Sequence, residues 1–128
     1  MRILSIDDSR TVRATVKSIV EVIGIDFIEA EDGLEALKVL EEISGNVDLI
    51  LLDWDMPNMN GYEFLQAVKN DSRYNGIPVI MLTTVSQEEK MIDAIRAGAK
   101  QYITKPFSSE TLLTKIIQAL GIESLEER

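Results

Sequence analysis

Acidic side chains follow two apolar segments of this sequence, and they are the residues best suited to chemistry. Asp7 and Asp8 come directly after the apolar run 3–6, and Asp53 and Asp55 follow the apolar run 47–52. Three carboxylates held within ~5 Å would repel one another by roughly 3 kcal/mol per pair at an effective dielectric constant near 20. A fold that gathers them therefore favours a bound cation between them.

The ligand types point to magnesium and to phosphoryl chemistry. The chain has no Cys and no His, so a metal would be held by oxygen atoms, which Mg²⁺ prefers, with waters and a phosphate completing its shell. A carboxylate beside Mg²⁺ can attack a phosphoryl group and form an aspartyl phosphate. The other phosphoryl oxygens then need positive charge and hydrogen-bond donors. Thr83, which follows the apolar run 79–82, and Lys105, which follows the edge-like segment 101–104, are of the right types.

Each of these residues also suits an ordinary structural role. Asp8 fits a helix N-cap, Asp53 a turn residue and Asp55 a solvated loop acid. Thr83 could satisfy a backbone group at a strand end, and Lys105 could be an exposed lysine before a turn. Taken one at a time these roles are as good as the chemical ones. Their common position, directly after predicted strands, favours a shared site.

The elements that must position these residues alternate along the chain. Strands are expected at 3–6, 26–30, 47–52, 79–82 and 101–104. Helices are expected from Asp8-Ser9 to Gly24, from Asp32 to Ser44-Gly45, after Gly61, from the capping box Ser86-Gln87-Glu88-Glu89 to Gly98, and from about Ser109 to Gly121. The alternation predicts parallel βαβ units, and so an α/β three-layer sandwich around a five-stranded parallel sheet. Functional groups gather at the carboxyl ends of the strands in such sheets.

Composition narrows the possible functions. The 128 residues include 22 Asp and Glu against 13 Lys and Arg, for a formal net charge of −9. Such a chain is repelled by phosphate backbones and anionic lipids, which argues against nucleic-acid and membrane partners. Without Cys and His, thiol catalysis, a serine-type triad and a built-in phosphohistidine are excluded. The apolar runs are too short to span a bilayer, so we expect a soluble, cytoplasmic protein.

Four motifs resemble the receiver domains of bacterial two-component response regulators. They are the acid pair in Ile6-Asp7-Asp8-Ser9, the phosphoacceptor strand and loop in residues 51–61, Leu82-Thr83-Thr84, and Thr104-Lys105-Pro106-Phe107 with its cis-proline turn. The similarity covers about residues 1–120, and Asp53-Trp54 with residues 7–10 is most similar to stand-alone chemotaxis regulators of the CheY type. The family's flavodoxin-like strand order, 2-1-3-4-5, is thereby implied.

The resemblance implies a role for each acidic residue. Asp53 would accept a phosphoryl group from the phosphohistidine of a partner sensor kinase and lose it by intrinsic autodephosphorylation. Asp8 and Asp53 would bind Mg²⁺ together with the backbone carbonyl of Asp55, while Asp7 would act mainly through water. On this interpretation the chain is a phosphoacceptor and not an enzyme.

The resemblance also implies a switch. Lys105, in a cis peptide bond with Pro106, would pair with the phosphoryl group, and Thr83 would turn toward it. Tyr102 would move into the vacated space, although it also fits an edge-strand tyrosine that packs on the fourth helix. The surface of the fourth helix, fifth strand and fifth helix would then bind an output partner such as a flagellar motor switch.

Two positions depart from the chemotaxis pattern. Asp55 stands where those regulators usually carry Asn, and Val85 stands where they usually carry a charged or polar residue. Both positions flank the line of water attack on an aspartyl phosphate. Asp55 and Val85 are therefore expected to tune the lifetime of the phosphoryl group and its recognition by a phosphatase.

Alternatives remain at this stage. An apolar run followed by Asp53-x-Asp55 is also typical of haloacid-dehalogenase phosphatases, but there the motif follows the first strand, and Asp7-Asp8 would stay unexplained. A flavodoxin would need neutral donors at residues 7–10, which are acidic. Within the receiver interpretation, a phosphorelay intermediate or the excised receiver of a larger regulator are open. We expect a monomeric receiver domain at 1–121 and a polar tail at 122–128.

Overall fold

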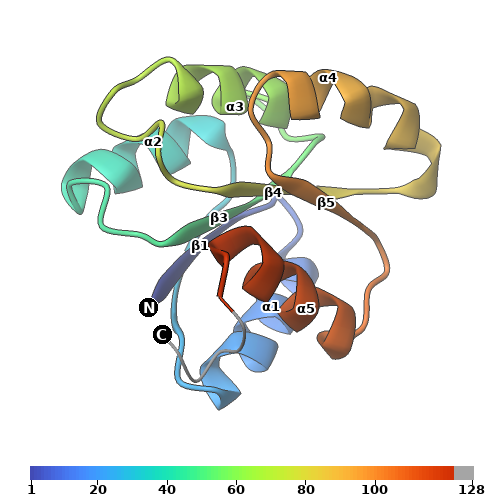
Figure 1. Ribbon diagram of the computed structural model, residues 1–128. Coiled ribbons are helices and arrows are strands. Elements are labelled where there is room, and N and C mark those ends of the chain that lie inside the picture. The colour runs from blue at the N-terminus through green and yellow to red at the C-terminus, as the bar shows by residue number, and fades with distance from the viewer. Residues whose placement is uncertain (123–128) are drawn as a thin grey trace.

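A five-stranded sheet between two layers of helices forms the centre of the molecule (Figure 1). The computed structural model describes residues 1–122. The strands are β1 (Arg2–Ile6), β2 (Asp26–Ala30), β3 (Leu49–Asp53), β4 (Val79–Thr83) and β5 (Gln101–Thr104). All neighbouring strands pair in parallel, in the order β2-β1-β3-β4-β5. The predicted sandwich, sheet and strand order are confirmed.

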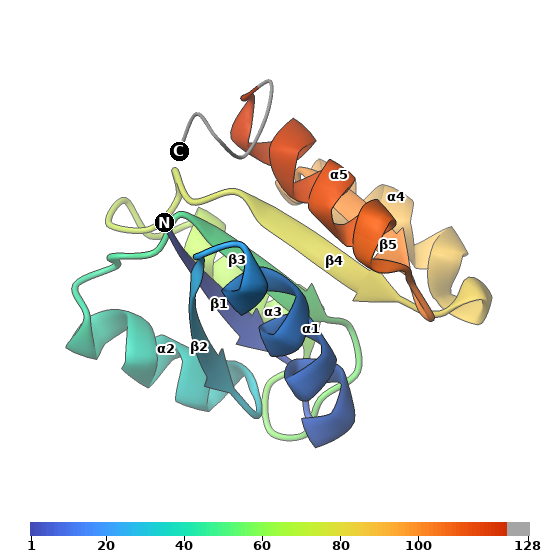
Figure 2. The same ribbon diagram turned by 90° about the horizontal axis from the view of Figure 1, so that it is seen from below.

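Helices cover both faces of the sheet. The α-helices are α1 (Arg10–Val22), α2 (Gly33–Glu42), α3 (Gly61–Lys69), α4 (Met91–Arg96) and α5 (Ser109–Leu120). Helices α1 and α5 lie on one face and α2, α3 and α4 on the other (Figures 1 and 2). Side chains alternate along a strand, so Leu49 and Leu51 of β3 join the α1–α5 core while Ile50 and Leu52 join the other. Burial on both faces fixes the end of β3 in the middle of the molecule.

Side-chain caps set where the helices begin. Ser9 caps α1, because its hydroxyl accepts the Val12 N–H at 3.2 Å. Asp32 caps α2 by accepting the Glu35 N–H at 2.9 Å. The structural role considered for Asp8 is therefore not the observed one, since its neighbour Ser9 does the capping and leaves the Asp8 carboxylate free for other contacts.

The fourth helical region differs from the prediction. A 3₁₀ segment, η1 (Val85–Lys90), precedes α4, and its cap is Thr84 in place of Ser86. The Gln87 side chain accepts the Thr84 N–H at 3.1 Å, whereas Ser86 contacts the Thr84 hydroxyl at 3.0 Å. The predicted capping box was thus two residues too late, because Thr84-x-x-Gln87 offers the same spacing directly after β4.

The β3–α3 loop is anchored to the start of α2. Asn58 donates its side-chain N–H to Asp32 at 2.8 Å, and Asn58 has a left-handed backbone with φ of +67°. Next to it, the Met59 side chain packs so closely on Gly33 that a Cβ there would lie 2.8 Å from the Met59 Cγ. This loop is therefore held from the α2 side.

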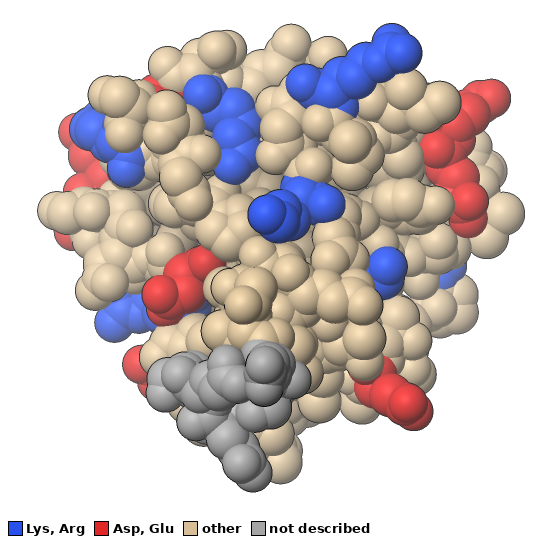
Figure 3. Space-filling model, in the orientation of Figure 1, with Lys and Arg blue, Asp and Glu red and all other residues tan. Residues whose placement is uncertain are grey.

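The described residues include no helix that is long and apolar enough to cross a membrane. On the face seen in Figure 3, lysines and arginines stand in separate places and form no continuous basic patch. Of the predicted polar tail, 122–128, residues 123–128 lie outside the described part of the chain.

Gly61 allows α3 to begin directly beside the end of β3. Its N–H donates to the Trp54 carbonyl at 2.9 Å. A Cβ at this position would fall on the carbonyl oxygen of Asp53, well inside contact distance. Because backbone atoms are the obstacle, a side chain here would displace the strand end that carries Asp53.

We predict that Gly61→Ala lowers the free energy of unfolding by about 1–3 kcal/mol, the usual cost of overpacking. This loss must exceed the ~0.5–1 kcal/mol that Ala gains over Gly in a helix. Urea unfolding measures the change. Gly76→Ala is the matched control, because a Cβ at Gly76 meets nothing within 4 Å. Equal stabilities for both variants would contradict the close approach.

Candidate functional site

Four strand ends bring the predicted site residues to one edge of the sheet. Asp7 and Asp8 follow β1, Asp53 ends β3, Thr83 ends β4 and Lys105 follows β5. Because all the strands are parallel, their carboxyl ends meet at the same edge. The predicted grouping is what the structure shows.

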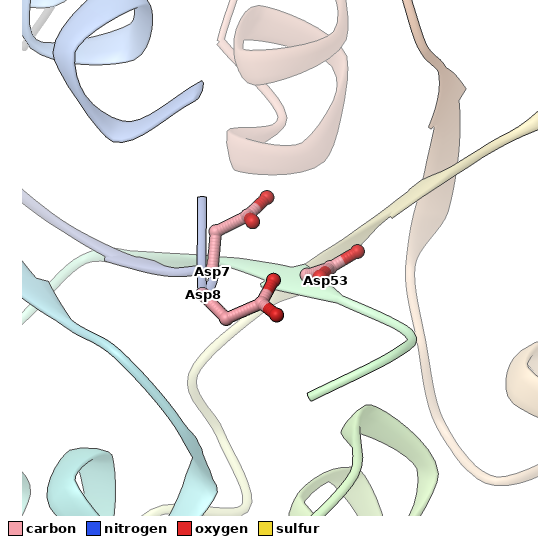
Figure 4. A group of neighbouring side chains, drawn as sticks. All are labelled: Asp7, Asp8 and Asp53. Atoms are coloured by element: carbon pink, nitrogen blue, oxygen red, sulfur yellow. The ribbon is translucent and has the colours of Figure 1, made fainter. Parts of the chain in front are cut away.

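Three carboxylates form the centre of the site. One oxygen from each of Asp7, Asp8 and Asp53 lies within 4.8 Å of the others. Figure 4 shows the Asp8 side chain reaching from the end of β1 toward Asp53. Asp7 is fully buried and Asp53 is 6% exposed, whereas Asp8 is exposed. The cluster is thus closed on its protein side and open to solvent at Asp8.

Lys105 joins two of these carboxylates. Its Nζ donates to Asp7 Oδ2 at 2.9 Å and to Asp53 Oδ1 at 3.0 Å. Burial lowers the pKa of Lys105, but the Asp7 and Asp53 carboxylates outweigh burial and hold it above its ordinary value. Its peptide bond to Pro106 is cis, as predicted. Lys105 therefore remains a cation that reaches across from β5 to β3 and β1.

The environment of Asp53 disfavours its charge. Burial and then the neighbouring Asp7 raise its pKa to about 6, although Lys105 acts in the opposite direction. Asp8 adds a smaller repulsion. At neutral pH the Asp53 carboxylate is ionised and can act as a nucleophile. A further cation nearby would strongly favour this ionised form.

The donor set fits a hard divalent cation. The carboxylates of Asp7, Asp8 and Asp53 carry three negative charges when ionised, and Lys105 supplies one positive charge, so two negative charges remain. Asp8 makes no ion pair with any described side chain. Every donor is an oxygen, and Asp8 is exposed, so water can complete the shell of a bound Mg²⁺. The residues present therefore fit Mg²⁺.

Thr83 is buried but makes no described contact with Asp53. Its hydroxyl lies 3.2 Å from the Thr84 carbonyl oxygen and 3.4 Å from Gln87 Oε1. Gln87 also donates through Nε2 to the Asp55 carboxylate. Sequence reasoning placed Gln87 only in a misplaced capping box, although the spacing Thr84-x-x-Gln87 was a signal that could have found it.

A second residue missed in the sequence lies beneath the acid pair. Arg13 is 6% exposed, donates to the Asp7 carbonyl oxygen, and forms an ion pair with Glu29 at 2.7 Å. It shares the buried stripe of α1 with Val16 and Val20. In the sequence, Arg13 lies three residues before Val16 and seven before Val20. This helical spacing could have predicted that Arg13 is buried on the same face.

The remaining predicted residues lie around the site. Val85 is 71% exposed at the start of η1. Tyr102 is 37% exposed on β5 and lines a hollow of about 370 Å³ with α4 residues such as Ile92 and Ile95. The Tyr102 ring thus lies at the surface beside α4, as its edge-strand role would place it. Its switch role stays a prediction.

Comparisons with known proteins identify the family of this chain. A family model described as "Response regulator receiver domain" matches residues 3–117. The chain belongs to the response regulator receiver family. The chemotaxis protein CheY1 of Helicobacter pylori strain 26695 is 40% identical over 122 residues, covering 94% of this chain and 98% of that protein. A CheY homologue of Campylobacter jejuni strain 81-176 is 38% identical over 127 residues, covering 98% and 97%.

A solved structure agrees with these relatives. The Vibrio cholerae chemotaxis protein CheY4 matches with a TM-score of 0.85 and 36% identity, covering 93% of this chain and 98% of that one. Receiver domains typically use Mg²⁺ at an acidic pocket and are generally signalling proteins rather than classical enzymes. Membership of the receiver family leaves no support for the haloacid-dehalogenase alternative.

The raised pKa of Asp53 predicts a pH-dependent stability in metal-free protein. The folded protein holds this proton up to about pH 6, whereas an ordinary Asp releases it near 3.8. Wild type therefore loses stability relative to Asp53→Asn as pH rises through that window. We expect Asp53→Asn to be more stable by on the order of 1–3 kcal/mol at pH 7.5 and by much less at pH 4. Urea unfolding in EDTA measures both; a difference independent of pH would contradict the assignment.

Proposed function

We propose that this chain is a phosphoacceptor switch in which Asp53 takes a phosphoryl group from the phosphohistidine of a partner sensor kinase. The observation that carries the proposal is the Lys105 ammonium held between Asp7 and Asp53 inside the acidic cluster. A cation fixed there is placed to stabilise the oxygens of a transferring phosphoryl group. Family membership supports the same chemistry.

The transfer follows from the contacts of Asp53. Lys105 bonds Oδ1 and so fixes the carboxylate's orientation, while Oδ2 has no described protein partner. As Oδ2 forms a bond to phosphorus, the phosphorus–nitrogen bond to the partner's imidazole breaks and the imidazole leaves with the electron pair. Asp7, Asp8, Asp53 and the backbone carbonyl of Asp55 would hold Mg²⁺. When bound, the metal supplies positive charge to the phosphoryl oxygens.

Signal output would follow from the side chains around the phosphoryl group. Thr83 would turn its hydroxyl toward the new oxygens, and Tyr102 would move into the vacated space. The α4–β5–α5 surface would then bind an output partner. Asp55 and Val85 would set how fast water removes the phosphoryl group, since both lie beside the site.

We place this switch in bacterial chemotaxis, as a monomer in the cytoplasm. Support comes from chemotaxis relatives that match at 38–40% identity over nearly the whole chain. Its receiver domain would span 1–121, and its partners would be a kinase, an output protein such as a motor switch, and a phosphatase. A phosphorelay intermediate or a receiver of a larger regulator would use the same chemistry and differ only in the partner.

The acceptor is tested by substitution. With acetyl phosphate and Mg²⁺, wild type should gain one hydroxylamine-sensitive phosphoryl group, detected by intact mass. Asp53→Asn should abolish labelling because it removes the nucleophile, whereas Asp55→Asn should still be labelled. Labelling of Asp53→Asn at the wild-type level would overturn the assignment of the acceptor.

The metal is tested through the single tryptophan. The Trp54 ring lies 5.7 Å from the Tyr62 ring, and Lys90 Nζ is 5.8 Å from its centroid, so it reports on the loop after Asp53. We predict a saturable fluorescence change with millimolar Mg²⁺ and a rise in melting temperature, because the metal binds only the folded cluster. Asp8→Ala should weaken both. If Mg²⁺ changed neither the fluorescence nor the melting temperature, and calorimetry detected no binding, the proposed metal site would be wrong.

A further inference from the structure

Gln87 spans the opening between two loops of the site. Gln87 is half-buried, whereas the other residues of η1 and its cap Thr84 are exposed. Its side chain reaches back to Thr83 and Thr84 at the end of β4 and across to Asp55 in the loop after β3. One amide group therefore joins the two loops that flank Asp53.

The partners fix the orientation of this amide. The Thr84 backbone N–H can only donate, so the atom that it meets at 3.1 Å must be the oxygen. The Asp55 carboxylate can only accept when ionised, so the atom facing it must be the nitrogen. Both requirements agree, and a flipped amide would lose both bonds.

The same oxygen also lies beside the buried Thr83 hydroxyl. That hydroxyl has a single hydrogen, and the two acceptors near it are Gln87 Oε1 and the Thr84 carbonyl oxygen. A Thr83 that donates toward these atoms cannot at the same time donate to a group on Asp53. The Gln87 contact and a Thr83–phosphoryl contact therefore exclude each other.

We propose that Gln87 is a positioning residue that holds the switch in its unphosphorylated arrangement. Its amide retains the Thr83 hydroxyl and the Thr84 backbone while Asp55 holds the amide in place. The Thr83 hydroxyl must leave the Gln87 oxygen before it can turn toward a phosphoryl group on Asp53. Gln87 thus sets how readily the active state forms, a role that rests on the function proposed above for Asp53 and Thr83.

Two variants with the net charge of wild type test this role. Gln87→Leu removes all three contacts of the amide, those with Thr83, Thr84 and Asp55. The double variant Gln87→Glu with Asp55→Asn reverses the bridge, because a Glu oxygen still accepts the Thr84 N–H while the Asn amide donates to the Glu carboxylate. Gln66→Leu is the control, since Gln66 is exposed on α3 and its side chain has no described partner.

The readouts are beryllofluoride affinity in saturating Mg²⁺, followed by Trp54 fluorescence, and hydrogen exchange of the Thr84 amide in metal-free protein. Gln87→Leu should bind beryllofluoride about three- to tenfold tighter than wild type, because one or two hydrogen bonds no longer oppose the active state. Its Thr84 amide should exchange faster. The double variant should restore both values toward wild type, and Gln66→Leu should match wild type.

Each other result overturns the role. Unchanged or weaker beryllofluoride binding by Gln87→Leu, or a double variant that behaves like Gln87→Leu, would show that the bridge does not restrain the switch. Gln87→Asn, too short to reach both partners, replaces Gln87→Leu if that variant melts well below wild type. Absence of beryllofluoride binding by wild type would instead overturn the proposed function, and the role of Gln87 with it, even if Thr84 exchange responded.

Discussion

Like charges crowded at one sheet edge are the constraint on which the rest of this structure depends. One carboxylate oxygen from each of Asp7, Asp8 and Asp53 lies within 4.8 Å of the others, and among residues 1–122 only Lys105 forms an ion pair with this group. A single ammonium cannot neutralise three carboxylates, so a net negative charge remains at the site in the folded protein. Burial of Asp7 and Asp53 increases the repulsion between their charges, because water is kept away and the local dielectric constant is lower.

The fold supports this arrangement from below and from the sides. The core on both faces of β3 holds Asp53 in place, and Gly61 lets the next helix start without displacing it. Ser9 caps α1, which leaves Asp8 available to the cluster. Arg13 fixes the Asp7 carbonyl, while its charge is matched by Glu29 and so does not quench the cluster.

Much of this could be predicted from the sequence because it follows from local patterns. Apolar runs and shorter alternating or edge-like segments predicted the strands, and parallel pairing placed Asp7, Asp53 and Lys105 at one edge. The start of the fourth helical region could not be chosen locally, since Thr84-x-x-Gln87 and Ser86-x-x-Glu89 have the same spacing. In the structure Gln87 also bonds Asp55, 32 residues earlier, and such a tertiary contact is not visible in the local spacing. The burial of Arg13 likewise depends on Glu29 from another strand.

The anchoring of the β3–α3 loop makes the two sides of the site differ in how firmly the chain is held. On the α2 side, Asn58 bonds Asp32 and Met59 packs on Gly33, so the loop is held in place there. On the α4 side, a short 3₁₀ segment with exposed residues is tied across the opening by one glutamine. If a group were added to Asp53, we would therefore expect the chain to shift on the side of α4 and β5 and not beside α2. The part of the loop beside α2 would keep its position.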